Sequence, residues 1–426
     1  MKKGIIEGFY GKARSFEERM SMVDFLWQIG MDQYIYAPKD DPYHNKKWRE
    51  PYPKKDLEKI KELAEFSKNK NIVFTWAIHP GQNPFDFDNY EEEIQKIFDK
   101  YRQLRSIGVS SFGLCMDDID RDKANEKRYD HMKLVKDLAD FVEKESGSNL
   151  YFVHPWYNDD WIDEKGYEYE SLLKDIENIN VMWTGSQVVS PISHKSYEDF
   201  AKRTGKKPYI WFNWPVNDYK NDQIFIEVFE FFDSKDLNFD GFYLNPMNQA
   251  ELSKIAIYQT NEFLKNPENY EAELTFRDAV KYLESKAYED LIEIAPSFYG
   301  SLVYERTESK KNTEDMEIKK AYDLGDFENL RSLLAKKIGA IENYQKNHTN
   351  KALFDEIKNF LESLEHLTRA VLSLLDKKID QAEECYKKSK SVEIEVFDGK
   401  YQEKNVRTSG VIDKIYKDLI IQVKSI

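Results

Sequence analysis

The fold is constrained most by an alternation of short apolar segments with longer amphipathic ones, which runs through about the first 265 residues. Short apolar segments bounded by turn residues are typical of buried strands, and apolar residues at three- and four-residue spacing are typical of helices. We predict helices at residues 16–29, 55–68, 89–106, 126–145 and 249–264. We predict eight strands, one beginning at residue 4 and the others at residues 32–37, 71–78, 109–116, 150–153, 179–183, 208–212 and 241–244. Eight strand-then-helix units give the count of a (β/α)₈ TIM barrel, an α/β fold with parallel strands.

The sequence changes character after residue 270. Residues 271–393 are rich in Glu, Lys, Leu and Ala, and apolar side chains recur there at helical spacing. The clearest run is Leu353, Ile357, Phe360, Leu361, Leu364, Leu367 and Val371. We therefore predict two domains, a barrel at residues 1–268 and an all-α helical domain at residues 269–426. Within the second domain, we expect an irregular connection at 394–409, a last helix at 411–423 and a solvated charged run at 309–312.

Charge and hydropathy exclude several classes of partner. The chain has 63 basic and 78 acidic residues, a net charge of −15. Nucleic acids and anionic membrane surfaces both require a basic face, so we expect neither as the main partner. No apolar run approaches the roughly 20 residues of a membrane span. The first residues lack the apolar core of a signal peptide, so we expect a cytoplasmic protein.

Cysteine and histidine give no sign of a metal or cofactor. The two cysteines, Cys115 and Cys385, are far apart in sequence and form no disulfide framework or zinc-binding spacing. No histidine pair has ligand spacing with a carboxylate. His79 and His154 follow strands, where they could contact a substrate. We predict no metal and no cofactor.

The central stretch of the chain is residues 109–120, in which an apolar strand is followed by the adjacent acids Asp117 and Asp118. In TIM barrels the carboxyl ends of the strands carry the chemistry. Repulsion between adjacent carboxylates separates their pKa values, which suits an acid/base pair. Alternatively, one acid caps the next helix and the other is solvated. Neighbours on a regular strand point to opposite faces, so a shared pocket requires the strand to end or bulge between them.

Other strands are also followed by polar or aromatic residues. Turn chemistry explains Gly, Pro and Asn at such positions. It explains Lys39, Tyr157, Trp211 and Asp218 less well. We therefore interpret the carboxyl ends of these strands as one binding site.

Five segments at different strand ends resemble glycoside hydrolase family 84, which contains the β-N-acetylglucosaminidases and the protein O-GlcNAcases. The resemblance covers about residues 4–265, in order. The segments are Gly4-Ile-Ile-Glu-Gly-Phe-Tyr-Gly11, Tyr36-Ala-Pro-Lys-Asp-Asp41, Met116-Asp-Asp-Ile-Asp120, Met182-Trp-Thr-Gly185 and Asn245-Pro-Met247.

The resemblance implies substrate-assisted catalysis, an exception to the scheme in which an enzyme carboxylate is the nucleophile. The 2-acetamido oxygen of the substrate attacks the anomeric carbon and forms an oxazoline. Asp117 would orient the acetamide N–H and balance its developing charge, and Asp118 would protonate the leaving oxygen and then activate water.

The resemblance also implies sugar-binding residues. The Gly8 backbone and Lys39 would hold hydroxyls of the sugar. Tyr157 would line the acetamide side, although the segment before it, His154-Pro-Trp, differs from the family's usual Pro-Thr-Glu. Trp211 would stack against the N-acetyl group.

Three further residues complete the implied sugar site. Asn213 would contact the acetamide or Asp117. Asp218 would accept hydrogen bonds from the 4- and 6-hydroxyls, and Asn245 would bind on the 4-hydroxyl side. A carboxylate at the 4- and 6-hydroxyls closes the non-reducing end and so favours exo action.

The resemblance thus implies a retaining exo-β-N-acetylglucosaminidase that acts on a GlcNAc-containing glycoside or glycoprotein. One alternative is an endo-acting enzyme of the hyaluronidase type. Another is a non-catalytic glycan-binding or interaction protein. With either reading, the helical domain is a candidate for contact with a protein.

Overall fold

A computed structural model describes residues 1–308, 313–397 and 400–424, so the charged run predicted at 309–312 lies outside the described residues. The chain divides into two compact units. One comprises Met1–Val216 and Phe231–Asn248, and the other comprises Asn217–Glu230 and Gln249–Ile426. The boundary expected between residues 268 and 269 stays a prediction.

The first unit contains a closed barrel of eight parallel strands in sequence order, as predicted. The barrel closes where the first strand pairs in parallel with the last as well as with the second. The strands are β1 (Lys2–Glu7), β2 (Gln33–Tyr36), β3 (Val73–Ile78), β4 (Ser111–Cys115), β5 (Leu150–Val153), β6 (Ile179–Trp183), β7 (Tyr209–Phe212) and β8 (Gly241–Leu244).

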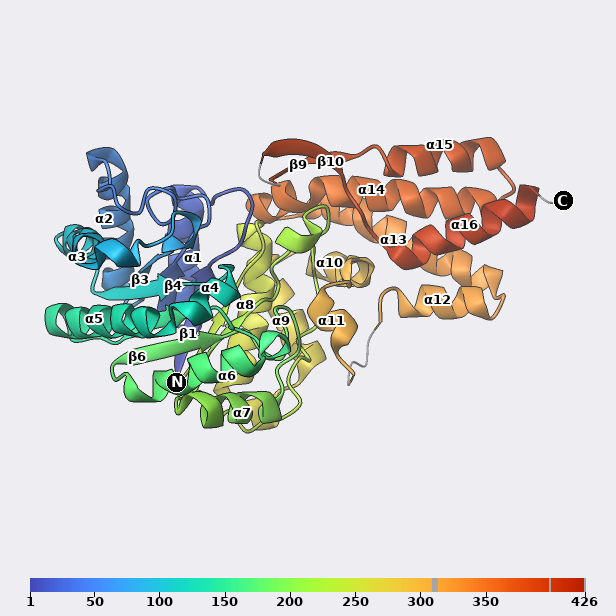
Figure 1. Ribbon diagram of the computed structural model, residues 1–426. Helices are drawn as coiled ribbons and strands as arrows, with labels where there is room; N and C mark the ends of the chain where they lie inside the picture. The colour runs from blue at the N-terminus through green and yellow to red at the C-terminus, as the bar shows by residue number, and fades with distance from the viewer. Residues whose placement is uncertain (309–312, 398–399, 425–426) are drawn as a thin grey trace. The chain divides into compact units, whose positions relative to one another are not determined.

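Amphipathic helices connect most of these strands and lie outside them in Figure 1, where this unit runs from blue to green. Helix α1 illustrates the local chemistry: Ser15 and Glu18 form a reciprocal capping box at its start, and Gly30 ends it in the left-handed conformation. The α-helices of the first unit are α1 (Phe16–Ile29), α2 (Lys54–Asn69), α3 (Tyr90–Arg105), α4 (Arg121–Glu126), α5 (Arg128–Ser146), α6 (Glu164–Leu172) and α7 (His194–Thr204).

One strand-to-strand connection differs from the predicted pattern. Residues 213–240, all of which the structure describes, contain the short 3₁₀ helix η5 (Asp218–Lys220) and no α-helix. The expectation of a helix after every strand is therefore wrong between β7 and β8. Apolar residues without helical spacing, including Phe231, pack in this segment instead; the Phe231 ring lies 4.8 Å from that of Trp214.

The barrel interior is filled by one cluster of buried side chains. Cys115 is 2% exposed, so this thiol is a core residue. Tyr151 and Tyr243 share a hydrogen bond of 2.6 Å between their hydroxyls, so the polar ends of these buried rings are paired. The cluster comprises Ile6, Ile35, Ala37, Ala77, Cys115, Tyr151, Val153, Tyr157, Met182, Trp211 and Tyr243.

The second unit is mainly helical, as predicted, and its longest helices lie side by side (Figure 1). The last helix agrees with the expectation for residues 411–423. The helices of this unit are α8 (Ala250–Lys265), α9 (Ala272–Leu283), α10 (Tyr288–Ile294), α11 (Leu302–Arg306), α12 (Met316–Asp323), α13 (Phe327–Asn347), α14 (Lys351–Leu375), α15 (Ile379–Ser389) and α16 (Gly410–Lys424).

Strands β9 (Glu393–Phe397) and β10 (Tyr401–Asn405) form an antiparallel pair where an irregular connection was expected. The expectation was wrong because the alternation of charged and apolar residues in 393–397 is the period of a strand with one covered face. Residues 398–399, within the same stretch, lie outside the described residues.

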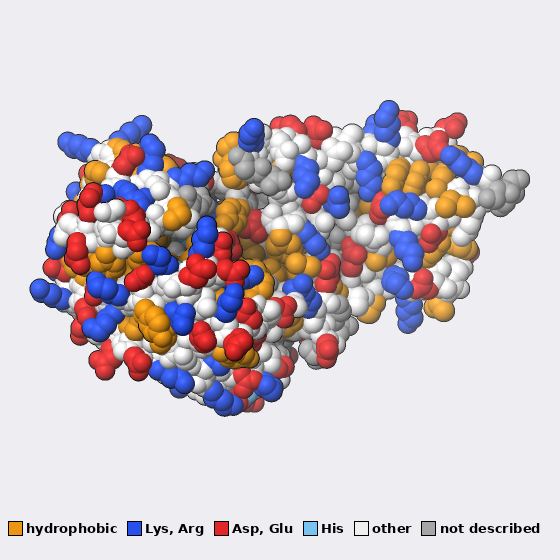
Figure 2. All heavy atoms as spheres, in the orientation of Figure 1, with side chains coloured by type: hydrophobic (Ala, Val, Ile, Leu, Met, Phe, Trp, Pro, Cys, Tyr) orange, Lys and Arg blue, Asp and Glu red, His pale blue; other side chains and the backbone are white. Residues whose placement is uncertain are grey.

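The surface carries charges of both signs. Figure 2 shows acidic and basic side chains interspersed over the visible face, with smaller apolar areas between them. None of the described helices is both long enough and apolar enough to cross a membrane.

The packing of β1 against β2 makes a stability prediction. A Cβ atom on Gly4 would lie 1.9 Å from the main-chain oxygen of Gln33, its partner across the two strands. Backbone atoms cannot move aside cheaply, so we expect Gly4→Ala to lower the free energy of unfolding by at least about 2 kcal/mol.

Gly339 in α13 is the matched control, because a Cβ atom there would meet nothing within 4 Å. Gly339→Ala should raise the free energy of unfolding by about 0.5–1 kcal/mol, since glycine is unfavourable inside a helix. Urea unfolding curves measure both. A Gly4→Ala protein as stable as the wild type would contradict the proposed close approach of the two strands.

Candidate active site

The two adjacent acids lie where strand β4 breaks. The strand ends at Cys115, and Asp118 has the left-handed φ of 57°. Aspartate tolerates this conformation better than most residues, because its short polar side chain can hydrogen-bond locally. The pair is therefore not on opposite faces of an unbroken strand, and the condition for a shared pocket is met.

A third acid caps the helix that follows. The side chain of Asp120 accepts a hydrogen bond of 3.1 Å from the backbone N–H of Lys123 at the start of α4. The alternative in which one of the adjacent acids caps this helix is therefore wrong. Both Asp117 and Asp118 have partners in the barrel mouth instead.

Asp117 is buried against a lysine and a histidine that follow the neighbouring strands. Lys39 Nζ, which follows β2, lies 2.5 Å from Asp117 Oδ2. His79, which follows β3, donates through Nε2 to the main-chain oxygen of Asp117 at 2.9 Å and lies 3.3 Å from Oδ1. Burial alone would raise the pKa of Asp117, but Lys39 and His79 outweigh it and hold this pKa well below its usual range. Asp117 is therefore a carboxylate at neutral pH.

Asp118 has a different environment. It is exposed, and its two oxygens accept hydrogen bonds from two phenols. Tyr157 OH donates to Oδ1 at 2.7 Å, and Tyr10 OH donates to Oδ2 at 3.1 Å. Burial, with Asp118 close by, raises the pKa of Tyr157 above its usual range, so the phenol keeps the proton that it donates. One acid is thus buried in an ion pair and its neighbour faces solvent.

Lys39 connects the surroundings of the two acids. Its Nζ lies 5.7 Å from the ring centre of Tyr10 and 5.9 Å from that of Trp211. An ammonium group at this distance is attracted to the faces of both rings. The side chains around Asp117 and Asp118 therefore form one continuous cluster.

A chain of hydrogen bonds forms another wall of this cluster. Gly8 N donates to Asn245 Oδ1 at 3.3 Å, and Asn245 Nδ2 donates to Asn213 Oδ1 at 3.0 Å. Trp211 Nε1 donates to the same Asn213 oxygen at 2.9 Å. Asn213 Nδ2 donates to the main-chain oxygen of Val188 at 2.7 Å, which fixes the orientation of its amide. The chain thus joins four predicted site residues from the ends of β1, β7 and β8.

Gly8 is required by this arrangement. A Cβ atom at this position would lie 2.4 Å from the Trp211 ring. The absence of a side chain lets the indole lie against the β1 backbone. This explains why glycine follows the first strand without any need for an unusual φ.

The predicted site residues other than Asp218 are brought together. The hydrogen bonds of Asn213 go to Trp211, Asn245 and Val188 and not to Asp117, so its contact with the acetamide stays a prediction. Asp218 starts η5 and belongs to the second unit, so its role at the sugar stays a prediction.

Sequence reasoning missed the role of Tyr10 and left that of His79 open. Tyr10 stands two residues after Gly8, in a segment that was already singled out, but nothing local shows that its hydroxyl reaches Asp118. The signal for His79 was its position directly after β3, between the predicted ends of β2 and β4.

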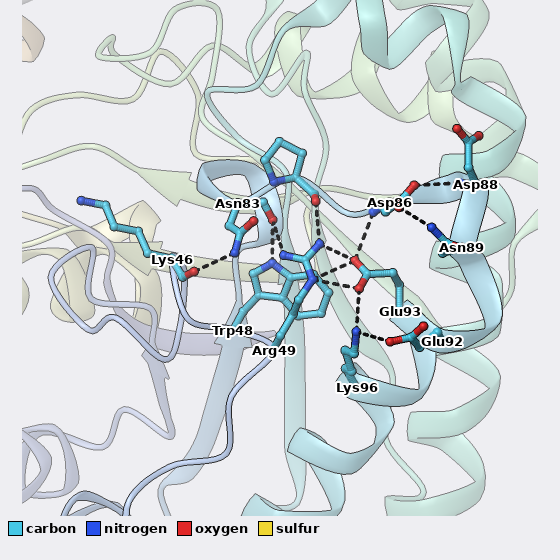
Figure 3. A network of polar contacts seen from close by, with 11 residues as sticks. Lys46, Trp48, Arg49, Asn83, Asp86, Asp88, Asn89, Glu92, Glu93 and Lys96 are labelled. Atoms are coloured by element: carbon cyan, nitrogen blue, oxygen red, sulfur yellow. Dashed lines mark hydrogen bonds and ion pairs between the residues drawn. The ribbon is translucent and has the colours of Figure 1, made fainter.

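A second network fastens the loop after β2 to the segment after β3, and Figure 3 shows it. Arg49 Nε donates to both carboxylate oxygens of Glu93, at 2.8 and 3.0 Å. Trp48 Nε1 donates to the main-chain oxygen of Asn83 at 2.7 Å, and Asn83 Nδ2 donates to that of Lys46 at 2.9 Å. Two further hydrogen bonds connect these segments to the partners of Asp117: Asn45 Nδ2 donates to the main-chain oxygen of Lys39 at 2.7 Å, and the backbone N–H of His79 donates to that of His44 at 2.8 Å.

Among the described residues, no group of three or more His, Cys, Asp and Glu side chains is arranged to hold a metal ion. The chemistry available to the cluster is that of carboxylates, phenols, an ammonium group and amides. These groups bind hydroxyls and amides and transfer protons.

The chain is similar in sequence to a known family and to individual proteins. A family model described as beta-N-acetylglucosaminidase matches residues 3–296. Protein O-GlcNAcase of Rattus norvegicus is 28% identical over 283 residues, which are 62% of this chain and 30% of that protein. The protein of the same name from Mus musculus is 28% identical over 279 residues, with the same coverage. The chain thus spans less than a third of the length of these relatives.

Solved structures extend the similarity to the whole chain. The structure described as CpGH84D superimposes with a TM-score of 0.85 at 25% identity, over 100% of this chain and 75% of that one. The O-GlcNAc hydrolase of Thermobaculum terrenum, solved as a mutant, has a TM-score of 0.80 at 24% identity, over 99% and 96% of the two chains. At this identity the second comparison bears on the fold alone.

The ion pair of Lys39 and Asp117 makes a stability prediction, because both side chains are less than 10% exposed. Lys39→Met leaves a buried carboxylate without its ammonium partner, which costs about 3–5 kcal/mol of unfolding free energy near neutral pH. In this variant we expect burial to raise the pKa of Asp117 above its value in the unfolded chain. The loss of unfolding free energy should therefore be small at a pH below the pKa of the unfolded chain, and it should grow as the pH rises toward the pKa of the folded protein. Urea unfolding at pH 7 and pH 4.5 measures the difference.

The double variant Lys39→Met/Asp117→Asn is the control, because it removes both charges together. It should be more stable than Lys39→Met at pH 7. If the two variants were equally unstable and the deficit did not depend on pH, the ion pair would not be the source of the effect.

Proposed function

The chain belongs to glycoside hydrolase family 84, the β-N-acetylglucosaminidases, and on that premise we propose that it is a retaining exo-β-N-acetylglucosaminidase. Its substrate would carry a terminal β-linked GlcNAc on a protein or a glycan. The observation that carries the proposal is the asymmetry of the two adjacent acids: Asp117 is buried beside Lys39 and His79, whereas Asp118 is exposed and held by two phenols.

Asp117 has the properties that the first step needs. The acetamide oxygen attacks the anomeric carbon, the bond to the leaving oxygen breaks, and the nitrogen of the acetamide becomes more positive. A carboxylate that stays ionised can accept the acetamide N–H and balance this charge. Lys39 and His79 keep Asp117 ionised by lowering its pKa. Oδ1 of Asp117 makes no hydrogen bond among the described residues and lies 3.3 Å from His79 Nε2, so in this proposal Oδ1 is the oxygen that accepts the acetamide N–H.

Asp118 has the properties of the proton donor. Its carboxyl group faces solvent, where a leaving group can depart and a water molecule can enter. In the first step it gives its proton to the leaving oxygen. In the second it takes a proton from the water that opens the oxazoline, and the product keeps the β configuration. Tyr10 and Tyr157 orient the carboxylate that remains between the steps.

The remaining cluster would hold the sugar. Trp211 offers an apolar face to the N-acetyl methyl group, and Gly8, Asn213 and Asn245 are linked in one fixed hydrogen-bonded chain beside it. Lys39 would meet a hydroxyl as well as Asp117. Exo action depends on Asp218 reaching the 4- and 6-hydroxyls.

A panel of aryl glycosides tests the proposal. We expect rapid hydrolysis of aryl β-GlcNAc, slower hydrolysis of aryl β-GalNAc and at least a thousandfold lower kcat/KM on aryl β-glucoside, on the order expected for loss of an intramolecular nucleophile. Rapid hydrolysis of the glucoside would rule out acetamide participation. Depolymerisation of hyaluronan without turnover of the aryl glycosides would favour the endo-acting alternative.

Asp118→Asn is the matched variant for the panel. Substrates with a poor leaving group should lose nearly all activity, whereas aryl glycosides with an activated leaving group should retain more, because their departing oxygen needs little protonation. Equal losses on both kinds of substrate would argue against Asp118 as the proton donor.

A further inference from the structure

His79 contacts both the main chain and the carboxylate of Asp117. Its Nε2 lies 2.9 Å from the Asp117 main-chain oxygen and 3.3 Å from Asp117 Oδ1. His79 is 3% exposed, so water does not compete for this nitrogen. The acid predicted to balance the acetamide charge therefore has its backbone and its side chain next to the same imidazole.

The proton of this imidazole has a defined place. Both oxygens that face Nε2 can only accept hydrogen bonds while Asp117 is ionised, so Nε2 must carry a proton. The other ring nitrogen, Nδ1, has no hydrogen-bond partner among the described residues. His79 is therefore a donor to Asp117 in its neutral form as well as in its protonated form.

The position of the imidazole is itself fixed. The backbone N–H of His79 donates to the main-chain oxygen of His44 at 2.8 Å, and the two rings lie 6.0 Å apart. A Cβ atom on Gly81 would lie 2.8 Å from the imidazole, so the backbone at Gly81 approaches the ring closely. The bracing network in Figure 3 holds the segments on which His44 and His79 lie.

We propose that His79 is a positioning residue for Asp117. Its Nε2–H holds the main-chain carbonyl at the turn where β4 ends and, with Lys39 on Oδ2, sets the direction in which Oδ1 meets the acetamide N–H. The proposal deepens the proposed function and rests on it. His79 would act through Asp117 and would not touch the substrate.

The pH dependence of this role follows from the charged groups around Asp117. Lys39 and His44 come from the segment after β2, Cys115 precedes Asp117 on β4, and Asp118 and Tyr10 lie on the solvent side. Burial lowers the pKa of His44 to about 3, so this neighbour is neutral throughout the working range. Burial also raises the pKa of Cys115, so the thiol stays protonated. Removing the His79 donor should therefore act on the titration of Asp117; it also removes one of the groups that lower the pKa of His44, but burial is the larger cause there.

The experiment compares His79→Leu with His79→Gln on aryl β-GlcNAc over a range of pH. Leucine fills the space without a donor, whereas the glutamine amide can place an N–H where Nε2 was. We expect His79→Leu to lower kcat about ten- to hundredfold with little change in KM, the range expected for a hydrogen bond to a charged group. The acid limb of its kcat/KM profile should move to higher pH, because a carboxylate that loses a donor has a higher pKa. His79→Gln should recover most of both effects.

His131→Leu is the matched control, because His131 is also a buried imidazole but contacts Tyr169 and Phe87. It should lower the thermal unfolding midpoint without moving the acid limb. The proposal would be overturned if His79→Leu and His79→Gln lost equal activity, with losses that follow their unfolding midpoints and an unmoved acid limb. Wild-type turnover of aryl β-GlcNAc tests the proposed function separately, since the inference about His79 rests only on kcat and kcat/KM of the variants relative to those of the wild type.

Discussion

The site depends on the buried ion pair between Lys39 and Asp117. It joins the ends of β2 and β4 at 2.5 Å, and each side chain is less than 10% exposed. A carboxylate so deeply buried would otherwise favour its protonated form, and the ammonium group reverses that preference. The ion pair thereby distinguishes two adjacent residues of the same type: Asp117 is held ionised, whereas Asp118 has no ammonium partner among the described residues. Without the ion pair, burial would raise the pKa of Asp117 and disfavour the charge that the proposed chemistry needs.

A second constraint is geometric, because the strand must break for neighbouring residues to face one pocket. The left-handed conformation of Asp118 provides this break. Asp120 caps α4, so neither Asp117 nor Asp118 does so. Sequence reasoning could state this condition, since the alternation of side chains along a strand is a general rule. It could not say which residue would adopt the unusual φ, because nothing in the local sequence shows the two phenols that meet the Asp118 carboxylate.

Much of the fold was predictable because strand and helix patterns are local. The eight barrel strands and the long helices of the second unit follow from short apolar runs and from helical spacing. The errors occurred where the pattern was short or absent: residues 393–397 alternate as a strand does, and residues 213–240 carry apolar residues that pack without forming a helix. The site residues likewise fall into those that local sequence predicts and those that it does not. Residues next to strand ends, such as Lys39, were predictable, whereas the reach of the Tyr10 hydroxyl and the donor role of His79 are set by tertiary packing.

The central claim is that Asp117 stabilises charge on an attacking acetamide. The most direct measurement is the rate of aryl β-GlcNAc hydrolysis as the acetamide is made less basic by successive fluorination, in the wild type and in Asp117→Ala. We expect the wild-type rate to fall steeply along the series, and the loss caused by Asp117→Ala to be largest for the unsubstituted acetamide, because participation is strongest there. A wild-type rate that does not depend on acetamide basicity would contradict the account.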